Sequence, residues 1–108
     1  MTDQHILDQL YAVVSERKGV DPETSYTARL FAKGTAKIAQ KVGEEGVETV
    51  IAALAETPEK VASESADLLY HLTVLWADQG VKPEDVWNIL AERQGISGIA
   101  EKASRTDK

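Results

Sequence analysis

Cysteine is absent from the 108 residues of the chain, which excludes disulfide bonds and thiolate metal sites. Aromatic residues are scarce at 6%, whereas hydrophobic residues make up 43%, so a core must consist mainly of aliphatic side chains. Long hydrophobic runs are also missing, because none reaches the roughly 18 residues of a membrane span. Residues 1–5 lack the basic and then apolar form of a signal peptide. We therefore expect a cytoplasmic protein with no membrane partner.

Positive charge is in short supply as well. The chain has 12 lysine and arginine residues against 18 aspartate and glutamate residues, which gives a formal net charge of −6. This balance does not favour binding to the phosphate backbone of DNA or RNA, so we expect no nucleic-acid partner. A phosphorylated small molecule remains compatible with it, because a bound metal ion reverses the local field.

Strand-like alternation of apolar and polar residues is absent, and β-branched runs are short, so the sequence predicts an all-α fold. Glycine, proline and capping residues divide the chain into helices. Thr35 is expected to cap one helix and Thr57 another, with Pro58 in the first helical turn. The expected helices cover residues 3–17, a short segment from Ser25 or Thr27 to Lys33, and residues 36–56, 58–79 and 83–93.

The helices expected at 36–56 and 58–79 are joined by a short connection, which predicts an antiparallel helical hairpin. A chain of 108 residues that is divided among helices has a thin core. We therefore expect a homo-oligomer in which the hairpin completes a helical bundle. Residues 1–93 would form one domain, and residues 94–108 would form a polar, partly mobile tail.

The helix expected at 36–56 carries charged side chains along one side. At about 100° of rotation per residue, they fall within a stripe about 100° wide. Apolar side chains cover most of the remaining circumference, which reverses the proportions of an ordinary surface helix. The charged stripe is therefore expected to face an interior cleft. Its members are Lys37, Lys41, Glu44, Glu45 and Glu48.

The helix expected at 58–79 repeats this arrangement with Glu64 and Asp67, three residues apart, and with His71 four residues further on. We therefore expect both helices to be largely buried, each presenting a pair of acids. Two carboxylates about 6 Å apart repel each other by about 3 kcal/mol at an effective dielectric constant of about 20. Converging carboxylates therefore need a counter-charge, and a hard divalent cation supplies one. A single acidic pair is usually a solvated helix face, but two pairs on otherwise apolar helices favour a metal site.

The candidate ligands are all oxygens, which favours magnesium over zinc or iron. The Glu-x-x-His pattern of di-iron bundles is missing, because Glu64 is followed three residues later by Asp67 and not by histidine. His71 lies on the acidic face, four residues after Asp67, and is interpreted as a hydrogen-bonded orienting residue in preference to a catalytic one.

Basic side chains precede the acids in the sequence; they are Arg29, Lys33, Lys37 and Lys41. They suit the binding of substrate phosphates, although a salt bridge within the helix to Glu44 or Glu45 explains Lys41 equally well. A metal ion beside phosphates suggests hydrolysis of a phosphoanhydride, in which a carboxylate takes a proton from the attacking water. Glu44 is the candidate base, because it flanks Glu45 without sharing its direction.

Three stretches, residues 25–34, 38–45 and 64–72, together closely resemble the phosphoribosyl-ATP pyrophosphatases. These are the histidine-biosynthesis members of the all-α, MazG-type nucleotide pyrophosphohydrolases. The Glu-Glu-x-x-Glu and Glu-x-x-Asp motifs are shared by the wider superfamily, whereas the runs beginning at Ser25 and Glu64 are more specific to this member. The similarity extends over nearly the whole chain, from about residue 5 to residue 105.

The resemblance implies a nucleotide pyrophosphohydrolase domain that cleaves the α–β phosphoanhydride of phosphoribosyl-ATP with water, using Mg²⁺ or Mn²⁺. The products would be phosphoribosyl-AMP and pyrophosphate, at the second step of histidine biosynthesis. It also implies a homodimer whose helices complete a four-helix bundle. Carried over by position, the metal ligands would be Glu45, Glu48, Glu64 and Asp67, the accessory acid near the metal-bound water Glu44, and the phosphate-binding residues Arg29, Lys33 and Lys41.

Two other functions fit the same residues. A pyrophosphohydrolase of the same superfamily that acts on a non-standard nucleoside triphosphate would share the metal site. A non-enzymatic helical dimerisation module would carry the acids as a solvated face, without any response to magnesium.

Overall fold

The computed structural model describes residues 5–94, and the regular secondary structure of this part consists of helices alone, without a strand. The all-α class is therefore confirmed. None of the described helices is long and apolar enough to cross a membrane. The expected tail falls almost wholly on residues 95–108, which lie outside the described part. The helices are α1 (Ile6–Glu16), α2 (Tyr26–Lys33), α3 (Thr35–Ala55), α4 (Pro58–Gln79) and α5 (Pro83–Gln94).

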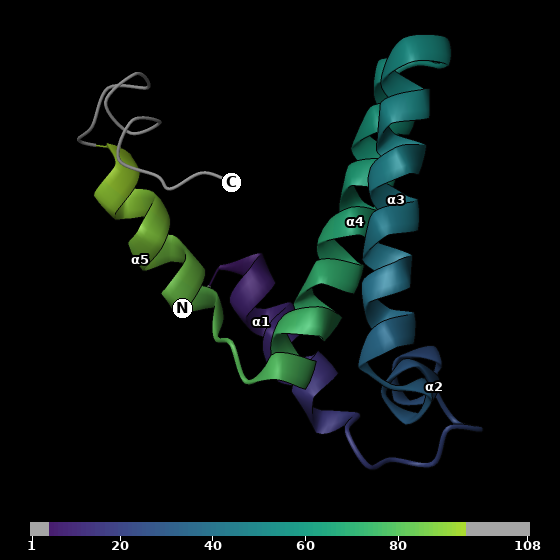
Figure 1. The fold of residues 1–108 in the computed structure, drawn as a ribbon, viewed down its shortest axis with the longest axis vertical. Helices are drawn as coiled ribbons and strands as arrows, with labels where there is room; N and C mark the ends of the chain where they lie inside the picture. Colours follow the sequence, from purple (N-terminus) through teal and green to yellow (C-terminus); the bar gives the residue numbers. More distant parts are fainter. Residues whose placement is uncertain (1–4, 95–108) are drawn as a thin grey trace.

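The two longest helices, α3 and α4, form the expected antiparallel hairpin and lie side by side along their length (Figure 1). The chain reverses between Ala55 and Pro58. The Thr57 side chain accepts a hydrogen bond from the backbone N–H of Lys60 at 3.2 Å, and Pro58 occupies the first helical turn, where its missing N–H costs nothing. The tip of the hairpin projects beyond the other helices (Figure 1).

The start of α3 differs from the expectation that Thr35 caps it. Gly34 is the N-cap, no side chain makes a capping bond, and Thr35 is already helical. The Thr35 hydroxyl instead donates to the carboxylate of Asp78 at 2.6 Å, which fastens the start of α3 to the end of α4. Gly34 adopts a φ of 95°, so the turn between α2 and α3 uses a backbone region that other residues rarely occupy.

The end of α4 and the start of α5 are set by two local contacts. Gly80 closes α4 in the left-handed conformation. Lys82 is a poor capping residue, because its side chain cannot accept a hydrogen bond from the first turn of α5. Asp85, three residues later, instead accepts a hydrogen bond from the Lys82 backbone N–H at 2.9 Å. Of the apolar residues of α5, Ile89 and Leu90 are exposed.

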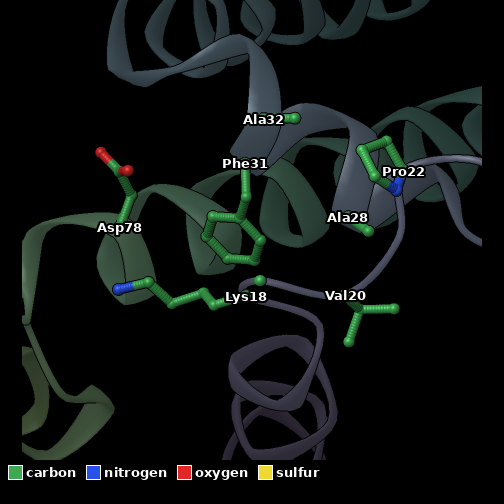
Figure 2. A pocket seen from close by; sticks show the side chains of 8 residues that line it. Lys18, Val20, Pro22, Ala28, Phe31, Ala32 and Asp78 are labelled. Carbon is green, nitrogen blue, oxygen red and sulfur yellow. The ribbon is translucent and has the colours of Figure 1, made fainter.

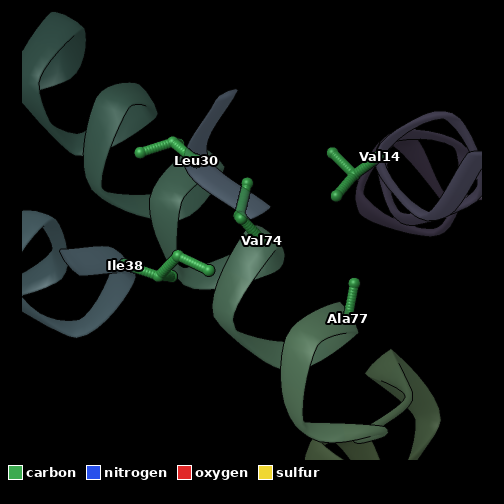
Figure 3. Packing of buried hydrophobic residues seen from close by; sticks show 5 residues of the cluster. All are labelled: Val14, Leu30, Ile38, Val74 and Ala77. Carbon is green, nitrogen blue, oxygen red and sulfur yellow. The ribbon is translucent and has the colours of Figure 1, made fainter. Parts of the chain in front are cut away.

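The hydrophobic core lies at the base of the hairpin, where α1 and α2 pack against α3 and α4 (Figure 3). All four helices contribute aliphatic side chains, as expected for a chain with few aromatic residues. Ile38 and Val74 are completely buried. The buried cluster consists of Val14, Leu30, Ile38, Val74 and Ala77.

The expectation that both acidic helices are largely buried is wrong for the single chain. In α3, Ile38 and Ala52 are buried, but Leu54 is 84% exposed. The reason is that the hairpin extends well past the core, so that beyond its base each helix has one neighbour (Figure 1). The exposed apolar side chains of α3 are Val47, Val50, Ile51 and Leu54.

We predict that Ile38→Ala lowers the free energy of unfolding by about 2–5 kcal/mol, because it leaves a cavity at the junction of the packed helices. Chemical denaturation followed by circular dichroism measures the change. Val13→Ala is the control, because Val13 is 47% exposed, and its effect should stay within about 0.5 kcal/mol. Equal losses in the two variants would contradict the assignment of the core.

Candidate functional site

The hairpin brings three carboxylates together. Glu45 of α3 and Glu64 and Asp67 of α4 each offer one oxygen, and these three oxygens lie within 4.8 Å of one another. Glu64 and Asp67 share a face of α4 because three residues make nearly one helical turn. Glu45 faces them because α3 and α4 run antiparallel in contact. We call these three residues the acid cluster.

The acid cluster suits a hard divalent cation. Its donors are all carboxylate oxygens, and Glu45 and Glu64 are half-buried while Asp67 is exposed. Such a set matches the oxygen preference of magnesium and calcium, and it leaves open coordination positions for water or a substrate. Exposed acidic groups can also gather without an ion, so the electrostatics of the cluster matter.

The carboxylates of the acid cluster repel one another electrostatically. The pKa of Glu64 is raised, first by partial desolvation of its carboxyl and then by the negative charges of Glu48, Asp67 and Glu45. Glu48 thus lies close enough to act on Glu64, although it does not belong to the acid cluster. A cation among these groups would relieve the repulsion and lower the pKa of Glu64 again.

Glu44 points to a different set of partners. One of its oxygens accepts a hydrogen bond from the Gln40 side-chain amide at 2.7 Å, and the other lies 3.3 Å from the Lys41 ammonium. These two contacts, with Gln40 the stronger, lower the pKa of Glu44. The carboxylate is therefore ionised at neutral pH and lies beside the acid cluster in sequence, without joining it.

The three predicted phosphate-binding residues have different surroundings. Lys41 lies one turn before Glu45 on α3, and its pKa is raised by the hydrogen bond to Glu44 and then by the nearby phenol of Tyr26. Arg29 is exposed and its Nε–H donates to the Pro22 carbonyl at 3.4 Å, towards the loop that precedes α2. Lys33 is exposed on the last turn of α2.

A chain of hydrogen bonds connects α2 to the acid cluster. The Nδ1 atom of His71 lies 2.8 Å from the backbone carbonyl oxygen of Asp67, and its Nε2 atom lies 3.1 Å from the hydroxyl of Tyr26. The expected orienting role of His71 agrees with this geometry. Tyr26 is not among the site residues predicted from the sequence, although it lies in the first stretch that carries the family resemblance. Beside it, the hydroxyls of Thr27 and Tyr70 form a second bond between α2 and α4.

A separate hollow opens where α2 meets the end of α4 and the loop after α1 (Figure 2). Its volume is about 440 Å³, and none of its lining residues belongs to the acid cluster or to the predicted site residues. Lys18 closes one side, where its ammonium donates to the Ala77 carbonyl at 3.1 Å and lies 5.8 Å from the centre of the Phe31 ring. The apolar walls include Val20, Pro22, Ala28 and Ala32.

Residues 7–94 match the profile of a protein family described as phosphoribosyl-ATP pyrophosphohydrolase. The chain is 68% identical over 100 residues to the phosphoribosyl-ATP pyrophosphatase of Azospirillum brasilense, covering 93% of this chain and 90% of that protein. It is 61% identical over 106 residues to the enzyme of the same name from Paramagnetospirillum magneticum, covering 98% and 97% of the two chains. A third such protein, from Rhodospirillum rubrum, is 61% identical over 100 residues, covering 93% and 86%.

We predict that Glu64→Gln stabilises the metal-free protein at neutral pH. A carboxyl whose pKa is raised in the folded state destabilises that state once it ionises, and glutamine removes this charge. The gain should shrink as the pH falls through the range in which carboxyls take up protons, because protonated Glu64 is as neutral as glutamine. Thermal unfolding in the presence of a chelator, repeated across this pH range, measures the effect.

The control for this prediction is Glu92→Gln, which removes an exposed carboxylate from α5. It should leave the pH dependence of the melting temperature unchanged. A Glu64→Gln protein that is less stable than the parent at pH 7 would show that the carboxylates do not repel one another as described.

Proposed function

We propose that this chain, which belongs to the phosphoribosyl-ATP pyrophosphohydrolase family, hydrolyses phosphoribosyl-ATP to phosphoribosyl-AMP and pyrophosphate. This is the second step of histidine biosynthesis, and we place it in the cytoplasm, because charged nucleotides do not cross membranes unaided. The observation that supports the proposal best is the convergence of Glu45, Glu64 and Asp67 in a chain of this family.

The reaction consumes one water and breaks one bond. The water oxygen bonds to a phosphorus of the α–β anhydride, the bridging P–O bond breaks, and pyrophosphate leaves. The proton that the water loses passes to a carboxylate. Since little covalent chemistry falls to the protein, positioning and charge compensation supply most of the rate enhancement.

The acid cluster would hold Mg²⁺, or Mn²⁺ in its place, with Glu48 as an additional ligand from the same helix as Glu45. When bound, the ion neutralises charge on the phosphate oxygens and polarises the attacking water. The fit rests on the all-oxygen donor set and on the pKa of Glu64, which is raised first by desolvation and then by the negative charges of Glu48, Asp67 and Glu45.

The remaining residues act on the water and on the phosphates. Glu44 is the proposed general base, because its place beside Glu45 puts a carboxylate that can take up a proton near the site. Lys41 would bind a substrate phosphate, since its ammonium has three N–H groups and the contact with Glu44 uses one of them. Arg29 and Lys33, both on α2, would bind phosphates farther from the acid cluster.

The assembly that we propose is a homodimer, or a larger homo-oligomer, in which the hairpins of two chains form a four-helix bundle. The exposed apolar residues of α3 recur at intervals of three and four residues and so form a single stripe, the pattern by which helices pair. At about 100° per residue, Glu44 and Glu48 lie between this stripe and the side of α3 that faces α4. A second copy on the stripe would therefore border the site. The stripe consists of Val47, Val50, Ile51 and Leu54.

We predict that the protein with magnesium releases pyrophosphate from phosphoribosyl-ATP but not from dUTP or dCTP, and that a chelator abolishes the release. Glu44→Gln should lower kcat by about 10²–10⁴-fold, the usual contribution of general-base catalysis, because the amide cannot take a proton from water. Steady-state kinetics with a pyrophosphate assay measure both effects.

Magnesium binding serves as the control for this experiment. Glu44→Gln should bind magnesium as the parent does, whereas a Glu48→Ala, Asp67→Ala double variant should lose the rise in melting temperature that magnesium produces. Full turnover by Glu44→Gln would remove Glu44 from the role of base. Turnover of dUTP or dCTP in preference to phosphoribosyl-ATP would contradict the proposed substrate.

We predict that the double variant Ile51→Lys, Leu54→Lys dissociates the homo-oligomer, because two cations on the apolar stripe cannot be buried without partners. Light scattering coupled to size-exclusion chromatography measures the mass. Leu90→Lys is the matched control, since it makes the same change at an exposed leucine of α5, away from the hairpin (Figure 1). A parent protein that is monomeric would contradict an interface on α3. So would an oligomer that dissociates in the Leu90→Lys variant but not in the Ile51→Lys, Leu54→Lys variant.

A further inference from the structure

The hydroxyl of Tyr26 is held in a fixed orientation. A carbonyl oxygen can only accept hydrogen bonds, so the bond to the Asp67 backbone requires the proton of the neutral His71 ring to be on Nδ1. Nε2 then carries a lone pair and accepts the proton of the Tyr26 hydroxyl. His71 is 6% exposed, which keeps water from competing for this acceptor. The Tyr26 oxygen therefore presents lone pairs, and no proton, to anything else that approaches it.

Tyr26 also lies at one particular end of the acid cluster. His71 follows Asp67 by four residues on α4, and Lys41 precedes Glu45 by four residues on α3. Because the two helices run antiparallel, these steps of about one turn lead to the same end of the cluster. Tyr26 is bonded to His71, so it stands there together with Lys41. The effect of the Tyr26 phenol on the pKa of Lys41 agrees with this placement.

The phenol is accessible as well as oriented. Tyr26 is 44% exposed, although its ring is stacked against Tyr70 at a centroid distance of 6.2 Å and an interplanar angle of 25°. A half-exposed tyrosine whose hydroxyl is oriented by a buried partner is poised to contact a ligand. An oxygen without a free proton repels a phosphate and attracts a hydrogen-bond donor.

We propose that Tyr26 is a substrate-binding residue whose oxygen accepts a hydrogen bond from a hydroxyl of the ribose that carries the triphosphate. This inference rests on the proposed function. With the α-phosphate at the acid cluster, the adjoining ribose falls about one helical turn away, and its 2′- and 3′-hydroxyls are the nearest donors of the substrate. His71 is a positioning residue that acts through Tyr26.

The test measures kcat/KM for phosphoribosyl-ATP and for its 2′-deoxy and 3′-deoxy analogues at that ribose. The parent should prefer the ribose form over one of the analogues by about tenfold, as expected for one lost hydrogen bond, and the affected analogue identifies the hydroxyl. Tyr26→Phe should lose this preference, mainly through a higher KM for the ribose substrate. Tyr70→Phe is the matched control, because it removes a phenol hydroxyl from the neighbouring bond between α2 and α4 and should keep the preference.

Two substitutions of His71 test the positioning role. Glutamine can present an acceptor near the place of Nε2, so His71→Gln should keep the preference for ribose. Asparagine can replace the donor at Nδ1 but does not reach Tyr26, so His71→Asn should lose the preference. Tyr26→Phe in the His71→Asn background should cause no further loss, because both changes remove the same contact.

The outcomes separate this inference from the proposed function. A parent that releases no pyrophosphate from phosphoribosyl-ATP overturns both. An active parent without any preference for ribose, or a Tyr26→Phe variant that keeps the preference, overturns the role of Tyr26 alone. Loss of the preference in Tyr70→Phe as well would assign the effect to the docking of α2 and would also overturn a direct contact.

Discussion

Repulsion among carboxylates is the constraint on which the rest of this structure depends. Glu45, Glu64 and Asp67 are brought within 4.8 Å of one another by a hairpin that is stabilised elsewhere, at its base. The packing of Ile38 and Val74 and the bond between Thr35 and Asp78 offset the cost of collecting like charges about two to three turns away. The result is a group of carboxylates that is already assembled in the fold, so the cation that we propose would bind without a large rearrangement of the helices.

The fold and the acid cluster were largely predictable because local rules determine them. Thr57 and Pro58 mark the turn of the hairpin, and the three-residue spacing of Glu64 and Asp67 puts them on one face of α4. The pairing of Glu45 with these two follows from the length of the hairpin. Thr35 was predicted wrongly because its hydroxyl has a better partner in Asp78, 43 residues away, which no local pattern reveals.

The burial of α3 was also predicted wrongly, and for a related reason. The amphipathic pattern of α3 shows which residues seek an apolar neighbour, but it does not show whether that neighbour belongs to the same chain. Leu54 belongs to the last turn of α3. This end of the hairpin lies beyond α1 and α2 (Figure 1). The bond between Tyr26 and His71 is another contact between distant segments, 45 residues apart, and so the part of Tyr26 could not be derived from spacing.

The short link between α3 and α4 also limits how the sequence can change over time. Each residue inserted or deleted between Glu45 and Glu64 would rotate one acidic side chain by about 100° relative to the other and separate the ligands. The turn between α3 and α4 consists of only Glu56 and Thr57, so it is too short to compensate for such a change. The loop between α1 and α2 holds none of the predicted ligands and can vary in length. Lineages of this protein are therefore expected to keep the length of the hairpin constant while gaining and losing residues near Gly19.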